Sequence, residues 1–432
     1  MKVLILEAGG EFYDPKAQSL YSASQQGDRH SAPIRARYAG FGGTSNVWAG
    51  WNRPLDAEDF APHPKRPGCH WPIDYSDLVP YYQKAEPVSG LGSGLELVGD
   101  SSEEHGLLSL LPGSPLLPED RFTHQPFKIR RLNFADYHRE SLSRAANVTI
   151  ALHTTVLRLH RMPQQPDRVE LELQLGDGSR GRLSGNKVVL AMGGLEIPRL
   201  LLLSGDTPLQ AIGNQHDNVG RYFCDHGFAD AGWFVPRKAE WDLAYYFGCQ
   251  QQQGNDHYVL RPVIRLSPKA SKQMELLNAA LYFYPAYESH PAFSSTAVKA
   301  ALEWWEIRKH QAIPVGQYQL LAQALTSPHQ ILTAAWRKLR SPTTASRWRL
   351  RVYFECRPVA ENRITLSSEK DRFSRPKLHL NWRLQEEDLT SVHRFAQSLD
   401  QSLRQAEVGY LQLPSGAEGW RSITECGKHP MG

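Results

Sequence analysis

The stretch VLILEAGG, residues 3–10, constrains the fold of this chain more than any other part of its sequence. Its short apolar run is typical of a buried strand, and the run ends on Glu7 and two glycines. In folds that bind dinucleotides, an acidic residue at such a strand end accepts hydrogen bonds from ribose hydroxyls. A glycine-rich phosphate loop precedes that strand by about 20 residues, but only six residues precede Glu7. Taken alone, Glu7 is equally well explained as a surface carboxylate.

The length and composition limit the class of protein. A chain of 432 residues is too long for one ordinary hydrophobic core and predicts two domains. Hydrophobic residues make up 41% and charged residues 22%, which is typical of a soluble globular protein. No apolar run approaches the roughly 20 residues that span a bilayer. A net charge of +4 is small at this length and gives no sign of a nucleic-acid partner.

The cysteines indicate neither a disulfide framework nor a zinc site. They are odd in number, widely spaced and free of any C-x-x-C pair. We therefore predict no metal site, and a reducing, cytoplasmic location is favoured. No signal peptide is visible at Met1, although a start further upstream would leave room for a lost one. The five cysteines are Cys69, Cys224, Cys249, Cys356 and Cys426.

Periodicity predicts most of the secondary structure. Residues 147–162, 257–267 and 347–358 alternate between apolar and polar side chains, as half-buried strands do. Residues 169–183 predict two strands joined by an Asp-Gly turn. Residues 187–190 read as another buried strand before a glycine turn. Residues 361–384 predict two strands around a polar turn, and residues 386–408 an amphipathic helix with an acidic start. A further helix is predicted from Asp77, capped by Asp74 or Ser76.

A second glycine-rich stretch, RARYAGFGGTSNVWAG, spans residues 35–50. Gly40, Gly42 and Gly43 allow backbone N–H groups to approach a phosphate or a flavin ring closely. Hydroxyl side chains follow these glycines, and Arg37 lies just upstream. A plain flexible loop is the alternative, but the two tryptophans of the region argue against it.

Three other patterns have structural explanations that we favour over functional ones. His226 and His429 lie near glycines, yet an isolated histidine is more often structural than catalytic. Arg347, Arg349 and Arg351 alternate along a predicted strand. They indicate a solvated sheet face more than a surface for anionic membranes. No Ser/His/Asp arrangement is visible.

In this order, these pieces resemble the glucose–methanol–choline (GMC) family of flavin oxidoreductases over nearly the whole chain. VLILEAGG resembles the family's ribose-binding strand, and the stretch around Gly42 its flavin-contacting signature. NVTIALHTTVLRL resembles the strand whose valine, here Val156, contacts adenine through its backbone. VVLAMGGLEIPRLLLLS resembles the second signature. Trp48 favours the pyranose-oxidase-like branch, and Val47 stands where some members attach FAD through histidine, so we expect non-covalent FAD.

The resemblance implies an α/β fold with two domains. An FAD-binding, Rossmann-like domain is expected from residues 1–70, 135–225 and 420–432, and an α+β substrate domain with an antiparallel sheet from residues 71–134 and 226–419. It implies oxidation of a CH–OH group of a sugar, polyol or other alcohol by hydride transfer to flavin N5, with an open choice of electron acceptor. The cofactor-binding residues that it implies are Glu7, Arg37, Gly42, Gly43, Thr44, Ser45, Asn46, Trp48, Val156, Ala191, Gly193 and His429.

The chain departs from the family pattern at both ends. The family's first strand, its G-x-G-x-x-G loop and its first helix have no counterpart before Lys2. The histidine and the His/Asn partner that take the alcohol proton would lie beyond Gly432, so we predict no catalytic residue in this chain. The expectation is an incomplete, inactive copy that lacks its first Rossmann strand and binds FAD poorly. A degenerate, non-catalytic binding protein and an NAD(P)-dependent enzyme remain as alternatives.

Overall fold

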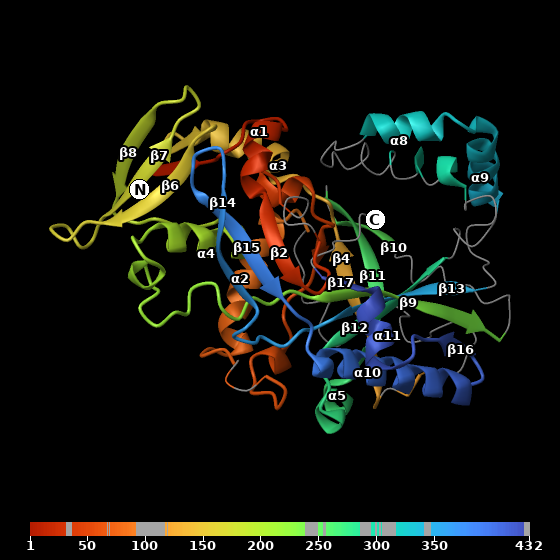
Figure 1. Cartoon of the computed structure of the whole chain (residues 1–432). Helices are drawn as coiled ribbons and strands as arrows, with labels where there is room; N and C mark the ends of the chain where they lie inside the picture. Colours follow the sequence, from red (N-terminus) through yellow and green to blue (C-terminus); the bar gives the residue numbers. More distant parts are fainter. Residues whose placement is uncertain are drawn as a thin grey trace. The chain divides into compact units, whose positions relative to one another are not determined.

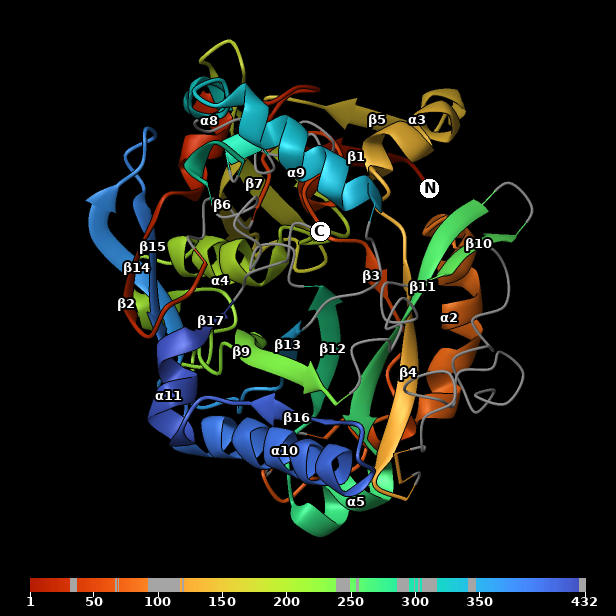
Figure 2. The same cartoon turned by 90° about the vertical axis from the view of Figure 1, so that its right-hand side faces the viewer.

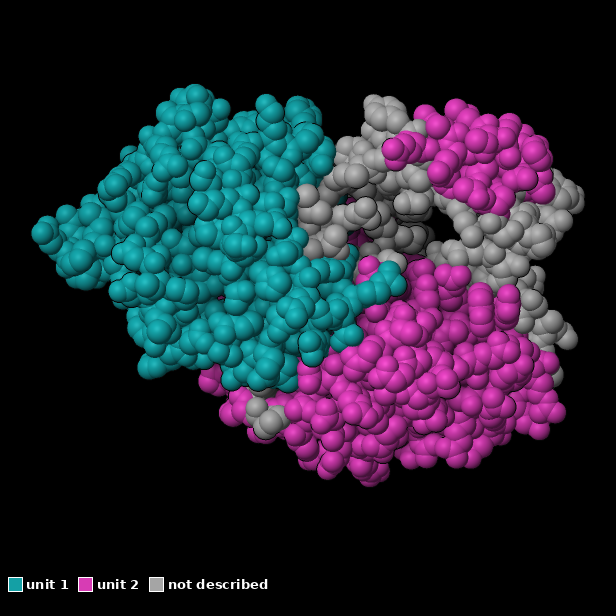
Figure 3. Space-filling view, in the orientation of Figure 1, with its two compact units in different colours: residues 1–47, 133–224, 358–383 teal, residues 48–132, 225–357, 384–432 magenta. Residues whose placement is uncertain are grey.

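The computed structural model shows a mixed α/β protein with several sheets (Figure 1). The chain divides into two compact units, each assembled from three separated segments (Figure 3). Unit 1 contains residues 1–47, 133–224 and 358–383, and unit 2 contains residues 48–132, 225–357 and 384–432. The structure describes residues 1–31, 37–66, 68, 70–91, 117–118, 120–237, 249–253, 256–285, 295–298, 300–301, 304, 317–340 and 347–426.

The described residues of unit 1 form three small sheets. β1 (Val3–Leu6) pairs in parallel with β5 (Val148–Ala151). The strands β6 (Thr155–Arg161), β7 (Val169–Gln174) and β8 (Arg180–Gly185) form an antiparallel sheet. The third sheet has the order β14 (Arg363–Lys370), β15 (Pro376–Trp382) and β2 (Ala23–Gly27), with β15 and β2 parallel. The helices are α1 (Pro15–Gln18), α3 (Phe134–Arg144) and α4 (Gly193–Leu203), with short 3-10 turns at Ser19–Tyr21, Gly43–Asn46 and Pro208–Gln210.

The core of unit 1 explains one wrong prediction. Four buried leucines from β6, β7 and α4 form a cluster, and Leu6, Val188 and Leu190 pack against it. Residues 187–190 nevertheless form no strand. Among the described residues, no strand lies beside this segment to complete a ladder. Only alternate side chains therefore face the core, and Val189 is 86% exposed.

A buried ion network joins α4 to the β14–β15 turn. Arg199 is only 2% exposed, and its Nη2 donates to Oδ2 of Asp371 at 2.8 Å. Arg375 donates from Nε to the same oxygen at 3.0 Å, and Glu196 accepts from Nη1 of Arg199 at 3.2 Å. This network and the β15–β2 pairing place residues 358–383 in unit 1, whereas the sequence assigned them to the substrate domain.

Unit 2 is built around a nine-stranded sheet in which every pairing is antiparallel, as predicted. Its order is β16 (Gly409–Gln412), β9 (Gly227–Pro236), β13 (Trp348–Phe354), β12 (Ala279–Pro285), β11 (Asp256–Leu266), β4 (Phe122–Ile129) and β3 (Trp51–Asn52). β10 (Cys249–Gln253) adds to β11, and β17 (Thr424–Cys426) adds to β9. The β17 pairing puts residues 424–426 in unit 2, whereas the sequence assigned them to the FAD-binding domain.

The helices of unit 2 include the amphipathic one that the sequence predicts. They are α2 (Tyr75–Val88), α5 (Pro268–Met274), α8 (Gln317–Ala324), α9 (Pro328–Arg340), α10 (Glu386–Gln405) and α11 (Gly416–Ile423), with a 3-10 turn at Ala57–Asp59. Asp74 is the N-cap of α2, in a capping box with Asp77. No helix among the described residues is long and apolar enough to cross a membrane.

The sheet of unit 2 has one apolar face and one polar face. Alternation along β13 buries Leu350 and Val352 and turns Arg351 and Tyr353 the other way. α10 runs along the sheet (Figure 2), and its buried residues include Val392, Phe395 and Leu399. The Ser391 hydroxyl of α10 accepts the N–H of Leu277, just before β12, at 2.7 Å. The apolar core of unit 2 therefore lies under α10.

Candidate functional site

Glu7 lies where β1 ends beside β5. Its N–H donates to the carbonyl of Ala151 at 3.0 Å, and its carbonyl accepts from Thr154 at 2.8 Å. The side-chain Oε1 accepts the N–H of Gly9 at 2.8 Å. Burial raises the pKa of the Glu7 carboxyl, and the backbone N–H groups of Gly9 and Gly40 act in the opposite direction. The two glycine-rich stretches thus meet at this carboxylate.

The glycines around this carboxylate serve two different purposes. A Cβ at Gly9 would lie 2.4 Å from the carbonyl oxygen of Ala39, so this glycine permits two segments to pack closely. By contrast, a Cβ at Gly43 or Gly193 would meet no atom within 4 Å, and both residues have positive φ angles, +54° and +78°. The backbone at these two positions is open to a close approach by a ligand.

The loop of residues 42–46 is held on the N-terminus of α3. Nδ2 of Asn46 donates to the carbonyls of Phe41 and Gly43 at 3.0 and 2.8 Å, and its Oδ1 accepts from Asn133 at 2.8 Å. Oγ of Ser45 accepts the N–H of Phe134 at 3.0 Å. Both side chains therefore shape the loop itself. It stays a prediction that Asn46 and Ser45 contact the cofactor. The same is true of Gly42 and of Thr44, which is exposed.

Arg37 belongs to a buried group of charged and aromatic side chains. It pairs with Glu196 of α4, and its Nη2 donates to the carbonyl of Tyr21 at 2.8 Å. The guanidinium carbon lies 4.5 Å from the centre of the Tyr21 ring. Burial raises the pKa of Tyr21, and the charges of Glu7 and Glu196 raise it further. The sequence reasoning missed Glu196 and Arg199, although their i, i+3 spacing in α4 is a recognisable ion-pair signal.

The other predicted contacts lie in different places. Val156 lies in β6, and its carbonyl accepts from Nη1 of Arg375 at 3.0 Å. Ala191 is exposed just before α4. Trp48 belongs to unit 2, where its Nε1 donates to the carbonyl of Leu132 at 2.9 Å. His429 lies outside the described residues.

These residues of unit 1 fit part of a dinucleotide. The backbone N–H groups of Gly9 and Gly40 already donate to the carboxylate of Glu7, and its two oxygens have further acceptor positions. Gly43 and Gly193 leave room beside their backbones. Arg37 and Asn46, in contrast, are held by other protein groups. The described residues therefore support adenosine recognition better than they support contacts between the cofactor and the side chains of Arg37 and Asn46.

The polar face of the unit 2 sheet corrects one expectation. Arg349 and Arg351 are not a solvated row, because both contact Asp230 on β9, at 3.1 and 2.9 Å. The rings of Tyr282 and Tyr353 stack 6.1 Å apart, and the His226 ring lies edge-on to Tyr353 at 5.3 Å. His226 therefore packs against an aromatic ring, and the structural role that the sequence favours for it stays a prediction. No group of metal-binding side chains occurs among the described residues.

Comparisons with known proteins give only distant similarities. No protein-family model and no curated protein matches the chain. It is similar to the crystal structure of formate oxidase, with 17% identity and a TM-score of 0.47 over 99% of this chain and 83% of that one. It is also similar to an FAD-dependent oxidoreductase from Chaetomium thermophilum, with 16% identity and a TM-score of 0.43 over 98% and 83% of the two chains. These similarities assign no cofactor, substrate or residue role to this chain.

Proposed function

We propose that the chain forms the cofactor-binding and substrate-binding units of an FAD-dependent oxidoreductase that resembles the GMC family and acts on a CH–OH group of a sugar, polyol or other alcohol. The observation that carries the proposal is the position of Glu7. Its carboxylate lies at the end of the parallel strand β1 and meets the second glycine-rich stretch at Gly40. A carboxylate at a parallel strand end, beside a glycine-rich turn, is the pattern that recognises a ribose.

Each residue of unit 1 has a binding task in this proposal. Glu7 accepts hydrogen bonds from the ribose hydroxyls, and the backbone of Val156 contacts the adenine. Gly43 and Gly193 allow their backbones to approach the cofactor, because neither carries a Cβ. Bound FAD supplies the acceptor for the hydride that leaves the alcohol carbon. The binding is non-covalent, since Val47 offers no nucleophile for an attachment.

Cofactor binding is the property to test first, because the proposal rests on residues assigned to the cofactor. We expect the purified full chain to bind FAD weakly but measurably, detected by quenching of flavin fluorescence during titration. Glu7→Gln keeps the size of the side chain and removes its charge, and it should weaken FAD binding about tenfold. Glu11→Gln is the matched control, because Glu11 is exposed and pairs with the exposed Arg139.

Three results would count against the proposal. Absence of FAD binding at any accessible concentration would favour a degenerate protein that binds another ligand. Preferential binding of NADH would favour a nicotinamide-dependent enzyme. Equal FAD affinity of Glu7→Gln and wild type would remove Glu7 from the site and leave the cofactor assignment without its main support.

The pH dependence of FAD binding provides a second test. The ionised carboxylate of Glu7 accepts two hydroxyl groups, whereas the protonated form loses one acceptor. Burial raises its pKa, so FAD affinity should fall as the pH is lowered from neutral through this raised pKa. Glu7→Gln should show a flatter profile. A wild-type profile identical to that of the variant would contradict the assigned role.

A further inference from the structure

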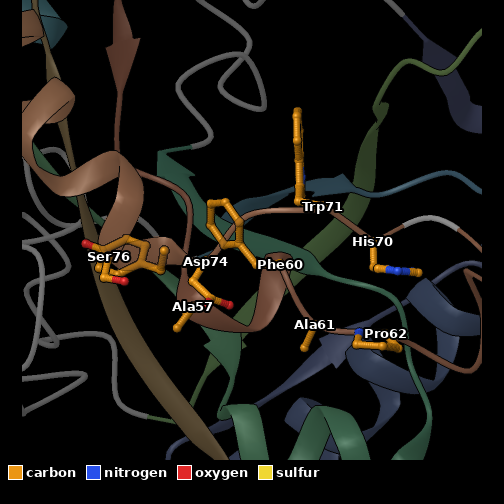
Figure 4. Close-up of a pocket in the computed structure, with 9 residues that line it drawn as sticks. Ala57, Phe60, Ala61, Pro62, His70, Trp71, Asp74 and Ser76 are labelled. Atoms are coloured by element: carbon orange, nitrogen blue, oxygen red, sulfur yellow. The ribbon is translucent and has the colours of Figure 1, made fainter.

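A pocket of about 580 Å³ lies within unit 2, between the 3-10 turn Ala57–Asp59 and the start of α2. Residues of three short segments line the pocket, and six of them define its shape and chemistry. Figure 4 shows Trp71 with Phe60 and Asp74 to one side of it and His70 to the other. The volume is in the range of small-molecule sites, roughly 300–1,000 Å³. The six residues are Phe60, Pro62, His70, Trp71, Asp74 and Ser76.

The wall that contains Phe60 is firmly attached to the sheet. Asp56 caps the 3-10 turn in a capping box with Asp59, and it pairs with Arg265 of β11. The second acidic residue of this turn, Asp59, accepts from Nδ2 of Asn278 at 3.1 Å through Oδ1. Two separate contacts to the sheet therefore fix this wall before any ligand arrives, which reduces the entropy cost of binding.

The opposite wall is the N-terminus of α2. Asp74 is the N-cap, in the capping box that fixes the first turn of the helix. The ring of Tyr75 lies 6.1 Å from that of Phe60, edge-on at 71°. The hydroxyl of Tyr82 accepts the N–H of Leu55 at 3.3 Å, which joins the helix to the segment before the other wall. Both walls are thus positioned by contacts within unit 2.

The chemistry of the lining narrows the class of ligand. Trp71 is 54% exposed although it belongs to a pocket, while Phe60 behind it is 6% exposed. The two ring centres are 6.3 Å apart at a 41° tilt, so these rings form a supported platform and not two parallel walls. His70, Asp74 and Ser76 add an imidazole, a carboxylate and a hydroxyl. Among the residues that the structure describes, the lining includes no lysine or arginine, which disfavours phosphate and carboxylate ligands.

From this arrangement we infer that the pocket binds a neutral saccharide. The apolar C–H face of a sugar ring lies on the indole of Trp71, and its hydroxyls exchange hydrogen bonds with His70, Asp74 and Ser76. An organic cation is the competing ligand for a carboxylate beside aromatic rings. The tilted rings do not enclose a cation from several sides, and this geometry favours the sugar. The inference goes beyond the proposed function and depends on none of the residues assigned to FAD.

Calorimetric titration of the full chain with maltotriose, cellotriose and xylotriose tests the inference. At least one trisaccharide should bind wild type, and Trp71→Ala should lose at least about tenfold in affinity. Trp71 is half exposed, so this variant should fold. Tyr81→Ala is the matched control, because Tyr81 is 63% exposed and does not line the pocket. Its affinity should equal that of wild type.

A second variant separates the sugar from a cation. Asp74→Asn keeps a good N-cap and removes the charge. For a saccharide its affinity should fall only a few-fold, whereas titration with choline should give no binding to either protein. Failure of all three trisaccharides, equal binding by Trp71→Ala, or choline binding that Asp74→Asn abolishes would each overturn the inference. FAD plays no part in these titrations, so a failed FAD test leaves their result interpretable.

Discussion

The nine-stranded sheet of unit 2 and the β1–β5 pair of unit 1 differ in how their strands are paired and in how their apolar side chains are covered. In the larger sheet, antiparallel neighbours join through short or long connections, and α10 lies along the apolar face. Leu350 and Val352 are 0% exposed there. The parallel pair has two strands, and Leu4 of β1 is 43% exposed. Parallel strands depend on further strands and helices that cover both faces.

This difference shows where the two units find their stability. Unit 2 relies on apolar burial between a sheet and a helix. Unit 1 buries a leucine cluster and, on β15, Leu378, Leu380 and Trp382, and it adds a buried network of three arginines with Glu196 and Asp371. Such a network is costly to break, because removing one partner leaves a buried charge without compensation. Substitutions in the two units should therefore fail for different physical reasons.

The largest effect is expected at Asp371. Asp371→Asn leaves Arg199 and Arg375 buried around a neutral side chain and should lower the free energy of unfolding by about 3–5 kcal/mol. Guanidinium unfolding measures the loss. Asp206→Asn is the control, because Asp206 pairs with Arg158 but is 85% exposed, and its loss should stay below about 1 kcal/mol. Similar effects of both substitutions would show that burial of the network contributes little.

A slightly smaller loss is expected in the apolar core of unit 2. Leu350→Ala creates a cavity on the covered face of β13 and should cost about 2–5 kcal/mol in the same unfolding measurement. Leu4→Ala, on the half-exposed strand of unit 1, should cost clearly less. If Leu350→Ala and Leu4→Ala lower the free energy of unfolding equally, burial does not explain the difference between the two sheets.

The capping box of α10 gives a pH-dependent prediction. Burial raises the pKa of Asp388 to about 6, although the N–H groups of Gln385 and Arg357 donate to it and oppose the shift. Between the ordinary pKa and about 6, the folded state binds more protons than the unfolded state, so stability falls as the pH rises through this window. The change is up to about 3 kcal/mol. Asp388→Asn should lack this pH dependence when the free energy of unfolding is measured at several pH values. If wild type and variant show the same dependence on pH, other groups cause it.

The smallest effect is expected at Val189. Its side chain is 86% exposed, so Val189→Thr should change the free energy of unfolding by no more than about 0.5 kcal/mol. The amides of residues 188–190 should exchange with deuterium faster than those of β13, because no ladder protects them among the described residues. Strong protection of residues 188–190 would mean that a partner strand covers them in solution.

Local patterns predicted most elements correctly, and pairing explains the exceptions. The alternation in residues 347–358 and the amphipathic period of residues 386–408 report directly on one buried face, and both elements are confirmed. Residues 187–190 have an equally good strand composition but form none. A strand also needs a neighbour, and a single sequence does not state which neighbour is present.

The candidate site was predictable to a different degree at each residue. Glu7 and Gly43 follow from short motifs with a clear physical reason, and the structure brings their segments together through Gly40. The roles of Asn46 and Ser45 in holding the loop on α3 depend on Asn133 and Phe134, which are far away in sequence. The pocket around Trp71 also depends on tertiary packing, since its aromatic residues look like ordinary core residues in the sequence.

The position of α10 in the chain has a consequence for synthesis. The strands β9, β12 and β13 all leave the ribosome before α10, which follows at residues 386–405. Until then, the face that contains Leu350 and Val352 has no helix to cover it, and uncovered strands invite pairing between nascent chains. The core of unit 2 is therefore completed only after α10 has emerged, and the yield of folded protein in a cell should depend on chaperones that bind the chain until Leu403 has emerged.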